Sequence, residues 1–180
     1  MLTDAHVNFS HKDLINSVDR LIKEGIEEGV SNFLAVNSNL YEFDTDFNLI
    51  ENFDCVDLTI GHHPCLCNEV DDDNFRKIFD DKISKNRKKI KVIGETGLDF
   101  SYDVSTINQI KSLKLHIEFA IKYELPILLH IREAFDETLK IISDYKSELK
   151  TILVHCFTGN DEDAYRLMDL DCYFSITGIM

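Results

Sequence analysis

The sequence of 180 residues lacks the features that would place it in several common classes of protein. It contains no run approaching the ~20 consecutive apolar residues that a membrane-spanning helix needs. The segment from Met1 to His6 has neither the basic start nor the apolar stretch of a secretory signal peptide. No G-x-G-x-x-G sequence follows the first apolar segment, which argues against a dinucleotide-binding sheet. We therefore expect a cytoplasmic protein without membrane association.

The cysteines give no sign of a disulfide framework. They are odd in number and scattered, so in a reducing compartment they are most simply free thiols. The five are Cys55, Cys65, Cys67, Cys156 and Cys172. Cys65 and Cys67 lie beside two histidines, but a C-x-C spacing without a second pair at a ribbon-like distance argues against a structural zinc site.

Positive charge is also scarce. The chain has 33 acidic and 19 basic residues, a net charge of −14. This balance argues against broad electrostatic binding to duplex nucleic acid, although one phosphate end can still bind at a site where a cation supplies the charge. The single basic run, 82–91, is most simply a solvated helix end, with a phosphate-backbone contact as the alternative. Nothing in the sequence indicates a dedicated protein partner.

Short apolar segments alternate with segments of helical periodicity along the whole chain. Seven strands are expected, at 2–9, 30–36, 55–60, 90–93, 125–129, 151–154 and 172–176. Six helices are expected between and after them, from Ser10 to the glycines at 25 and 29, and at 44–53, 71–86, 106–123, 135–149 and 161–170. Such alternation predicts a parallel α/β sheet with right-handed crossovers. We predict a TIM-like (β/α)₈ barrel over residues 1–180, as a single incomplete domain whose eighth strand is missing. An open doubly wound sheet is the structural alternative.

Polar side chains stand where several of these strands end. Glu95 follows the strand at 90–93 and is flanked by Gly94 and Gly97. His130 and His155 each follow an apolar strand directly, and the first strand carries His6. Each residue alone could simply begin a turn or border the core. Because a parallel barrel brings the carboxyl ends of its strands to one face, we expect these side chains to converge.

Imidazole and carboxylate groups that converge from separate strands form a natural site for divalent metal ions. Two ions could share Glu95 between them. Such a pair can bind a scissile phosphate, lower the pKa of a water molecule and stabilise the leaving oxygen.

Five segments resemble motifs of the TatD family, in the family's order and over nearly the whole chain. The resembling segments are 4–9 (D-x-H-x-H-L in the family), 61–64 (G-x-H-P), 93–100 (G-E-x-G-L-D-Y), 125–134 (L-P-v-x-x-H-x-R-x-A) and 154–159 (H-C-F-S/T-G). The resemblance implies a metal-dependent hydrolase with an amidohydrolase-like barrel. Family members act as DNases, often removing nucleotides from the 3′ ends of single strands.

The resemblance also implies roles for individual residues. Glu95 is the catalytic residue and a metal ligand, His130 and His155 are metal ligands, and His6 is a ligand of the second ion. The substrate-binding positions are His63, Asp99 and Arg132, and His63 and Asp99 are expected to touch either the substrate or the ligand shell. The expected cofactor is a divalent ion, Mg²⁺ in the first place with Mn²⁺ or Zn²⁺ as alternatives, and up to two ions per subunit. The expected substrate is the end of a DNA single strand, with RNA as a further candidate.

The sequence departs from the family pattern at two places. Asn8 stands where the family motif has a second histidine, and a neutral amide is a weaker ligand, so one ion is expected to bind loosely. The family's metal-binding aspartate on strand eight has no counterpart, which leaves two edges of the predicted barrel without a partner. We expect a fragment, a truncated product or a chain completed by another polypeptide. Two alternatives to a DNase therefore stay open: an amide or ester hydrolase for a small substrate, and an inactive remnant.

Overall fold

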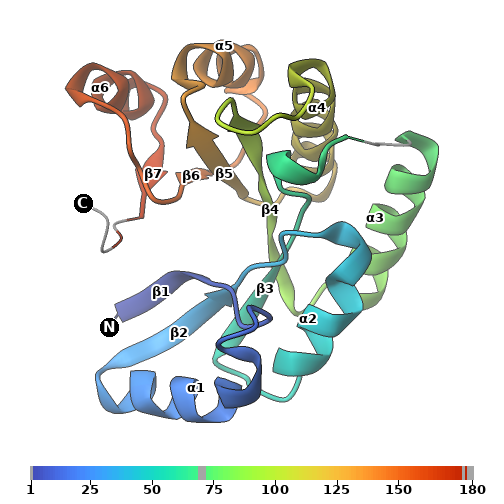
Figure 1. Ribbon diagram of the computed structural model, residues 1–180, viewed down its shortest axis with the longest axis vertical. Coiled ribbons are helices and arrows are strands. Elements are labelled where there is room, and N and C mark those ends of the chain that lie inside the picture. The colour runs from blue at the N-terminus through green and yellow to red at the C-terminus, as the bar shows by residue number, and fades with distance from the viewer. Residues whose placement is uncertain (1, 69–71, 176, 178–180) are drawn as a thin grey trace.

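The computed structural model describes residues 2–68, 72–175 and 177, which form one parallel sheet with helices packed on its outer side (Figure 1). The seven strands follow one another in the order β1-β2-β3-β4-β5-β6-β7, and every neighbouring pair is parallel. They are β1 (Leu2–Val7), β2 (Val30–Ala35), β3 (Val56–Ile60), β4 (Ile90–Asp99), β5 (Ile127–Arg132), β6 (Ile152–Val154) and β7 (Tyr173–Phe174). The predicted parallel sheet of seven strands is confirmed.

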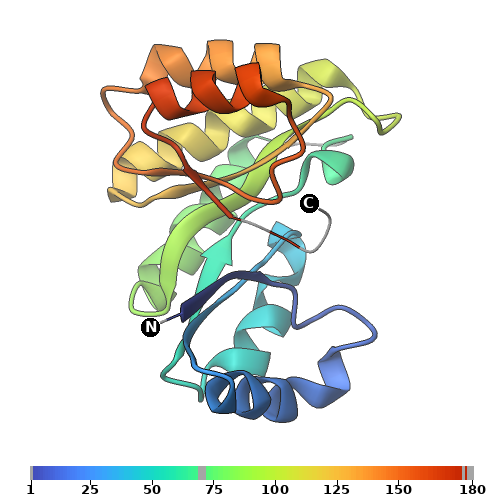
Figure 2. The same ribbon diagram turned by 90° about the vertical axis from the view of Figure 1, so that its left-hand side faces the viewer.

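Six α-helices connect or follow the strands. They are α1 (Val18–Glu27), α2 (Phe43–Ile50), α3 (Asp72–Asn86), α4 (Thr106–Tyr123), α5 (Phe135–Tyr145) and α6 (Asp161–Asp169). Figures 1 and 2 show them around the outside of the sheet, as right-handed β-α-β crossovers require. Within the described part of the chain, no helix is long and apolar enough to cross a membrane.

The sheet buries apolar side chains on both faces. The larger cluster fills the space between sheet and helices, where Phe43, Phe75 and Phe79 are completely buried. A second cluster lies on the opposite, inner face, and it consists of Leu34, Val36, Val92 and Leu128 with Leu153 packed against them. Strands that are buried on both sides read as continuous apolar runs, which explains why β5 and β6 are so easily recognised in the sequence.

The sheet is curled into part of a barrel. His6 on β1 stacks on His155 just after β6, with ring centroids 4.1 Å apart and ring planes inclined by 10°. Strands β1 and β6 are separated by four others in the sheet, so a flat sheet would keep these rings far apart. The curl therefore brings the carboxyl ends of the strands to one central face, as the barrel prediction requires.

Strand β4 is longer than predicted, because it continues past Glu95 to Asp99. Between its pairings Ile93↔Ile127 and Thr96↔Leu129, β4 has one residue more than β5. This extra residue is a β-bulge at Gly94 and Glu95, a feature that re-aims a side chain without ending the strand.

Two glycines of β4 allow this course. Gly94 and Gly97 have φ of +130° and +149°, and a Cβ on them would lie 2.4 Å from the carbonyl oxygen of Leu128 and 1.9 Å from that of His130. A side chain at either position would thus collide with the β5 backbone. The two glycines, which suggested the end of a strand in the sequence, instead belong to a bulged strand that lies close to β5. The added pairing carries β5 on to Arg132, three residues past its predicted end.

Smaller differences concern the ends of elements. Helix α1 begins at Val18, after a short 3₁₀ turn at Ile15–Ser17, so the prediction of a helix beginning at Ser10 is wrong. The Ser10 hydroxyl donates instead to the side chain of Asn8. The predicted starting residue of α3, Asp71, and the last residue of the predicted strand 172–176 lie outside the described residues.

The basic run lies at the opposite end of the sheet from the candidate site. Arg87, Lys88 and Lys89 directly precede β4, at the amino end of that strand. The Arg87 guanidinium donates to the carbonyl oxygens of Ile90 and Tyr123, and the Lys89 ammonium donates to that of Phe53. These contacts favour a helix end over a phosphate-backbone contact as the role of the basic run.

His116 is a completely buried histidine in the outer core, where its ring lies edge-on to Phe75 and Phe79. Its Nδ1 donates to the carbonyl oxygen of Ser112, and its Nε2 has no partner among the described residues. Burial lowers the pKa of this imidazole to about 3, so it stays neutral in the folded protein.

This buried histidine predicts an acid-sensitive stability. The unfolded chain binds a proton at His116 below pH ~6.5 and the folded chain does not, so the free energy of unfolding falls as the pH falls. Between pH 7 and pH 5 this one group costs about 2 kcal/mol. Urea unfolding at several pH values is expected to show this slope, and His116→Leu is expected to flatten it. An unchanged slope in the variant would contradict the assignment.

Candidate metal centre

The carboxylate of Glu95 is the centre of a cluster of histidines at the carboxyl face of the sheet. Its Oε1 lies 2.6 Å from Nε2 of His155 and 3.1 Å from Nδ1 of His130, and its Oε2 lies 3.3 Å from Nε2 of His6. Nε2 of His63, from the loop after β3, is 3.7 Å from Oε1. Five strands or strand ends therefore supply one cluster, and four of its members are the residues expected to bind metal.

Ligand atoms in this cluster fall into two groups that share Glu95. One group is His6, Glu95 and His155, and the other is His63, Glu95 and His130, with all ligand atoms of a group within 4.8 Å of one another. A carboxylate that belongs to two such groups is the arrangement by which a protein bridges two divalent ions.

The hydrogen bonds around the histidines indicate where their protons lie. Asp99 Oδ2 accepts a bond of 2.8 Å from His130 Nε2, so the proton of the neutral His130 ring is on Nε2. The lone pair of His130 Nδ1 is then directed at Oε1 of Glu95 and at His155. Lone pairs that converge in this way repel one another unless a cation or a proton lies among them.

His63 differs from the other three imidazoles. Its Nδ1 accepts a hydrogen bond from the backbone N–H of Cys65, which leaves the ring proton on Nε2. Nε2 is therefore a donor, and it lies 3.3 Å from Nδ1 of His130. A donor nitrogen suits a hydrogen bond to a substrate oxygen better than a bond to a metal ion, although the distances alone place His63 in a ligand group.

One further polar atom agrees with a metal site. His6 Nε2 is buried without a hydrogen-bond partner among the described residues, and its 3.3 Å contact with Glu95 is an ion-pair distance without hydrogen-bond geometry. Buried polar atoms normally have partners, so this nitrogen is available to a further group. His155 Nδ1 is also buried without a partner among the described residues, but the other ring nitrogen, Nε2, is the one that faces Glu95.

Charge at the cluster also suits a cation. Burial by itself would raise the pKa of Glu95, but the imidazoles of His130, His155 and His6 around it hold it well below its usual range. Burial lowers the pKa of His155, and it lowers that of His63 to about 4. Burial would also lower the pKa of His130, but Glu95 and Asp99 raise it above its usual value. A charged Glu95 beside neutral His155 suits a metal ion, and His130 binds one only in its neutral form.

Asp99 lies behind the cluster and is completely buried. Its Oδ1 accepts hydrogen bonds from the backbone N–H and the hydroxyl of Ser101, and its Oδ2 bonds His130. Burial would raise its pKa, but these hydrogen bonds and the nearby imidazole lower it. Asp99 is thus placed to orient His130, and it lies in the shell around the candidate ligands.

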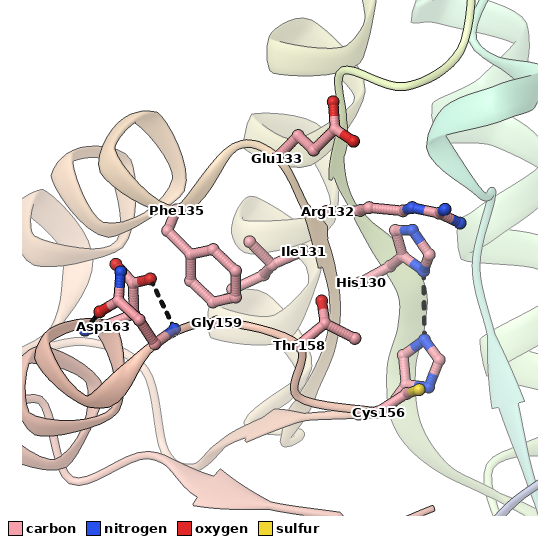
Figure 3. Close-up of a pocket in the computed structure, with 11 residues that line it drawn as sticks. His130, Ile131, Arg132, Glu133, Phe135, Cys156, Thr158, Gly159 and Asp163 are labelled. Atoms are coloured by element: carbon pink, nitrogen blue, oxygen red, sulfur yellow. Dashed lines mark hydrogen bonds between the residues drawn. The ribbon is translucent and has the colours of Figure 1, made fainter. Parts of the chain in front are cut away.

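Arg132 is exposed and borders a cavity of about 740 Å³ between the loops that follow β5 and β6. Figure 3 shows its side chain on the same side of β5 as the His130 ring, with Glu133 pointing elsewhere. Asp136, at the start of α5, pairs with Arg166 at 2.6 Å and not with Arg132. Arg132 thus borders the cavity on the side of β5 that carries His130.

Several further polar residues have contacts that the sequence does not reveal. His62, next to His63, is buried and accepts from the N–H of Leu40 while its Nε2 donates to the carbonyl oxygen of Leu66. Asn8 bonds Ser10, and Asp4 at the start of the first strand is exposed. The role of Ser101 was missed, because a serine in a loop carries no sequence signal for bonding a buried carboxylate.

A curled parallel β/α sheet with histidines and a shared glutamate at the carboxyl ends of its strands defines a class, the metal-dependent hydrolases built on a TIM-barrel fold. Comparison with known proteins identifies the family within this class. Residues 3–180 match the model of the family described as TatD related DNase, and the chain belongs to this family.

Relatives of known name agree with this membership. An uncharacterized metal-dependent hydrolase of Buchnera aphidicola is 31% identical over 193 residues, covering 99% of this chain and 70% of the relative. The 3′-5′ ssDNA/RNA exonuclease TatD of Citrobacter koseri is 27% identical over 178 residues, covering 97% of this chain and 66% of the relative. The chain thus spans about two thirds of the length of these relatives.

A solved structure supports the fold. The crystal structure of a TatD homolog from Escherichia coli superimposes with a TM-score of 0.85 at 21% identity, covering 96% of this chain and 66% of that one. The match confirms the TIM-barrel type of fold that the alternation of strands and helices predicted.

The position of Asp99 leads to a prediction about metal affinity. Asp99→Asn keeps the shape of the side chain but removes the charge that fixes the proton of His130 on Nε2. Because such partners orient a metal-binding histidine, affinity for Mn²⁺ is expected to fall about 10- to 100-fold. Calorimetric titration of the two proteins with Mn²⁺ measures this. Unchanged affinity would mean that His130 does not depend on Asp99.

Proposed function

We propose that this chain carries the site of a metal-dependent phosphodiesterase that removes nucleotides from the 3′ ends of single-stranded DNA, and of RNA as well. The single observation that carries the proposal is the buried Glu95 carboxylate shared by two groups of ligand atoms. When bound, divalent ions supply Lewis acidity toward a phosphate oxygen and lower the pKa of a nearby water molecule.

Each residue of the cluster has a defined task in this proposal. Glu95 is the proposed catalytic residue, because its carboxylate belongs to both groups of ligand atoms and would hold the metal ions. His6 and His155 would be ligands with it in one group, and His130 in the other. His63 donates a hydrogen bond from Nε2 to a phosphate oxygen, and Arg132 neutralises the phosphate charge with its planar guanidinium. Asp99 orients His130 and does not touch the substrate.

Identity of the ion follows from the donor set. Three imidazoles and one carboxylate are softer ligands than the all-oxygen sets that Mg²⁺ favours. We therefore propose Mn²⁺ or Zn²⁺ ahead of Mg²⁺, which reverses the order expected from the sequence. With His63 as a hydrogen-bond donor, the group around His130 offers fewer protein ligands than the group around His155, so an ion held there would have positions open to water and substrate.

Support for a nucleic-acid substrate comes from relatives named as ssDNA/RNA exonucleases, at 26–27% identity. The net charge of −14 is compatible with such a substrate only where cations gather at the site. This favours a single phosphate bound at the metal centre over a long duplex bound along a basic surface.

Glu95→Gln tests the proposal most simply. The amide cannot bridge two cations, so cleavage of a 3′-labelled single strand in Mn²⁺ is expected to fall about 10³-fold or more. Glu148→Gln, at an exposed position after α5, is the matched control and is expected to cleave like the unchanged protein.

Other outcomes distinguish the alternatives. Intact hydrolysis of a small ester or amide, with no cleavage of the labelled strand by the unchanged protein, would replace the proposal with an amide or ester hydrolase. An absence of saturable Mn²⁺ binding that depends on His130 and His155 would indicate an inactive remnant.

Arg132→Ala tests how the substrate phosphate is held. Loss of one charged hydrogen-bond donor is expected to raise KM for a single strand about 10-fold or more, with a smaller change in kcat. Arg132→Lys is expected to recover part of this loss, because it restores the charge without the planar fork. Equal KM values for all three proteins would remove Arg132 from the substrate site.

A further inference from the structure

Two exposed tyrosines lie in loops at the carboxyl end of the sheet, and one of them, Tyr102, contacts a histidine of the candidate site. Tyr102, in the loop after β4, lies edge-on to His63 with ring centroids 6.3 Å apart and an interplanar angle of 90°. Tyr41, in the loop after β2, is edge-on to His62 at 5.7 Å and 87°. About half of each tyrosine is exposed, 48% for Tyr102 and 53% for Tyr41. Each ring thus packs edge-on to a histidine and leaves a large area open to solvent.

Hydrogen bonds anchor the loop that carries Tyr102. Ser101 donates both its backbone N–H and its hydroxyl to Asp99, the residue that also bonds His130. The side chain of Gln109 on α4 accepts from the N–H of Asp99 and donates to its carbonyl oxygen. The position of Tyr102 is therefore tied to the same buried carboxylate as the metal centre, which leaves its ring little freedom to lose on binding.

Charge at this face is unfavourable for binding a polyanion. The described loops at the carboxyl ends of β1 to β6 span 8–14, 36–42, 61–68, 100–105, 132–134 and 155–160. They contain two basic residues, Lys12 and Arg132, and four acidic ones, Asp13, Glu42, Asp103 and Glu133. Phosphates beyond the one at the metal centre therefore find almost no cationic partner, although neutralised phosphates dominate most nucleic-acid affinity.

Exposed aromatic rings offer the remaining source of affinity. Stacking of a base on an aromatic side chain depends little on sequence and does not require positive charge. Tyrosine suits this use because it presents a large, rigid face with few rotatable bonds.

We propose that Tyr102 and Tyr41 form a base-stacking surface that holds the nucleotides next to the scissile phosphate through their bases rather than through their phosphates. The proposal rests on the phosphodiesterase function proposed above and adds what holds the strand. The occupant is an unpaired strand, because stacked and paired bases of a duplex cannot present their faces to these rings.

A comparison of two strands tests the surface. One probe is a fluorescein-labelled oligothymidylate with a nuclease-resistant phosphorothioate 3′ end, and the other is an abasic strand of the same length and linkages. Anisotropy titrations in Mn²⁺ are expected to show tighter binding of the strand with bases by the unchanged protein. Tyr102→Ala is expected to weaken binding of that strand about 5- to 100-fold and binding of the abasic strand by less than about twofold.

Control variants separate stacking from folding defects. Tyr102→Phe keeps the ring and is expected to bind both strands like the unchanged protein, and Tyr41→Ala is expected to act in the same direction as Tyr102→Ala. Tyr165→Ala removes a similarly exposed tyrosine on α6 and is expected to change neither affinity. Equal affinity of the unchanged protein for the two strands, or an equal loss for both in Tyr102→Ala, would overturn the proposal.

Failure of the proposed function is measured separately. Bis(p-nitrophenyl) phosphate is a small phosphodiester with no bases, so its hydrolysis by the unchanged protein in Mn²⁺ reports on the metal centre alone. Hydrolysis of this compound without a preference for strands with bases would refute the stacking surface and leave the phosphodiesterase standing. A preference for the strand with bases, without hydrolysis of this compound, would refute the phosphodiesterase and leave a surface that binds single strands.

Discussion

A buried carboxylate needs compensating partners, and this constraint organises the active face of the molecule. Glu95 is 5% exposed, yet its pKa is held well below the usual range by the imidazoles around it. Those imidazoles come from elements far apart in the sequence, so the charge is stable only when the sheet has curled. Folding and assembly of the site are thereby the same event, since the uncompensated charge would be costly in any flatter arrangement.

Backbone geometry at β4 makes this arrangement possible. The bulge at Gly94 and Glu95 re-aims the glutamate, and the missing side chains at Gly94 and Gly97 let β4 lie close against β5. Asp99, at the end of the same strand, then reaches the far nitrogen of His130. One strand therefore supplies the central carboxylate of the cluster, the residue that orients His130, and the anchor for the loop with Tyr102.

Much of the fold could be predicted from the sequence, because strands buried on both faces leave uninterrupted apolar runs such as Ile127–Leu129. The convergence of Glu95, His130 and His155 followed from parallel topology, since each directly follows or ends such a run. What could not be predicted depends on local geometry: the continuation of β4 past two glycines, and the burial of Asp99. The proton position of His63 likewise depends on one backbone N–H, that of Cys65, which no residue pattern reveals.

The central claim is that Glu95 is shared between two divalent ions, and anomalous diffraction from crystals grown with Mn²⁺ tests it directly. The account predicts two anomalous peaks, each in contact with a carboxylate oxygen of Glu95, one also touching His6 and His155 and the other touching His130. A single peak, peaks that do not touch Glu95, or none at all would contradict the claim and with it the proposed role of the cluster.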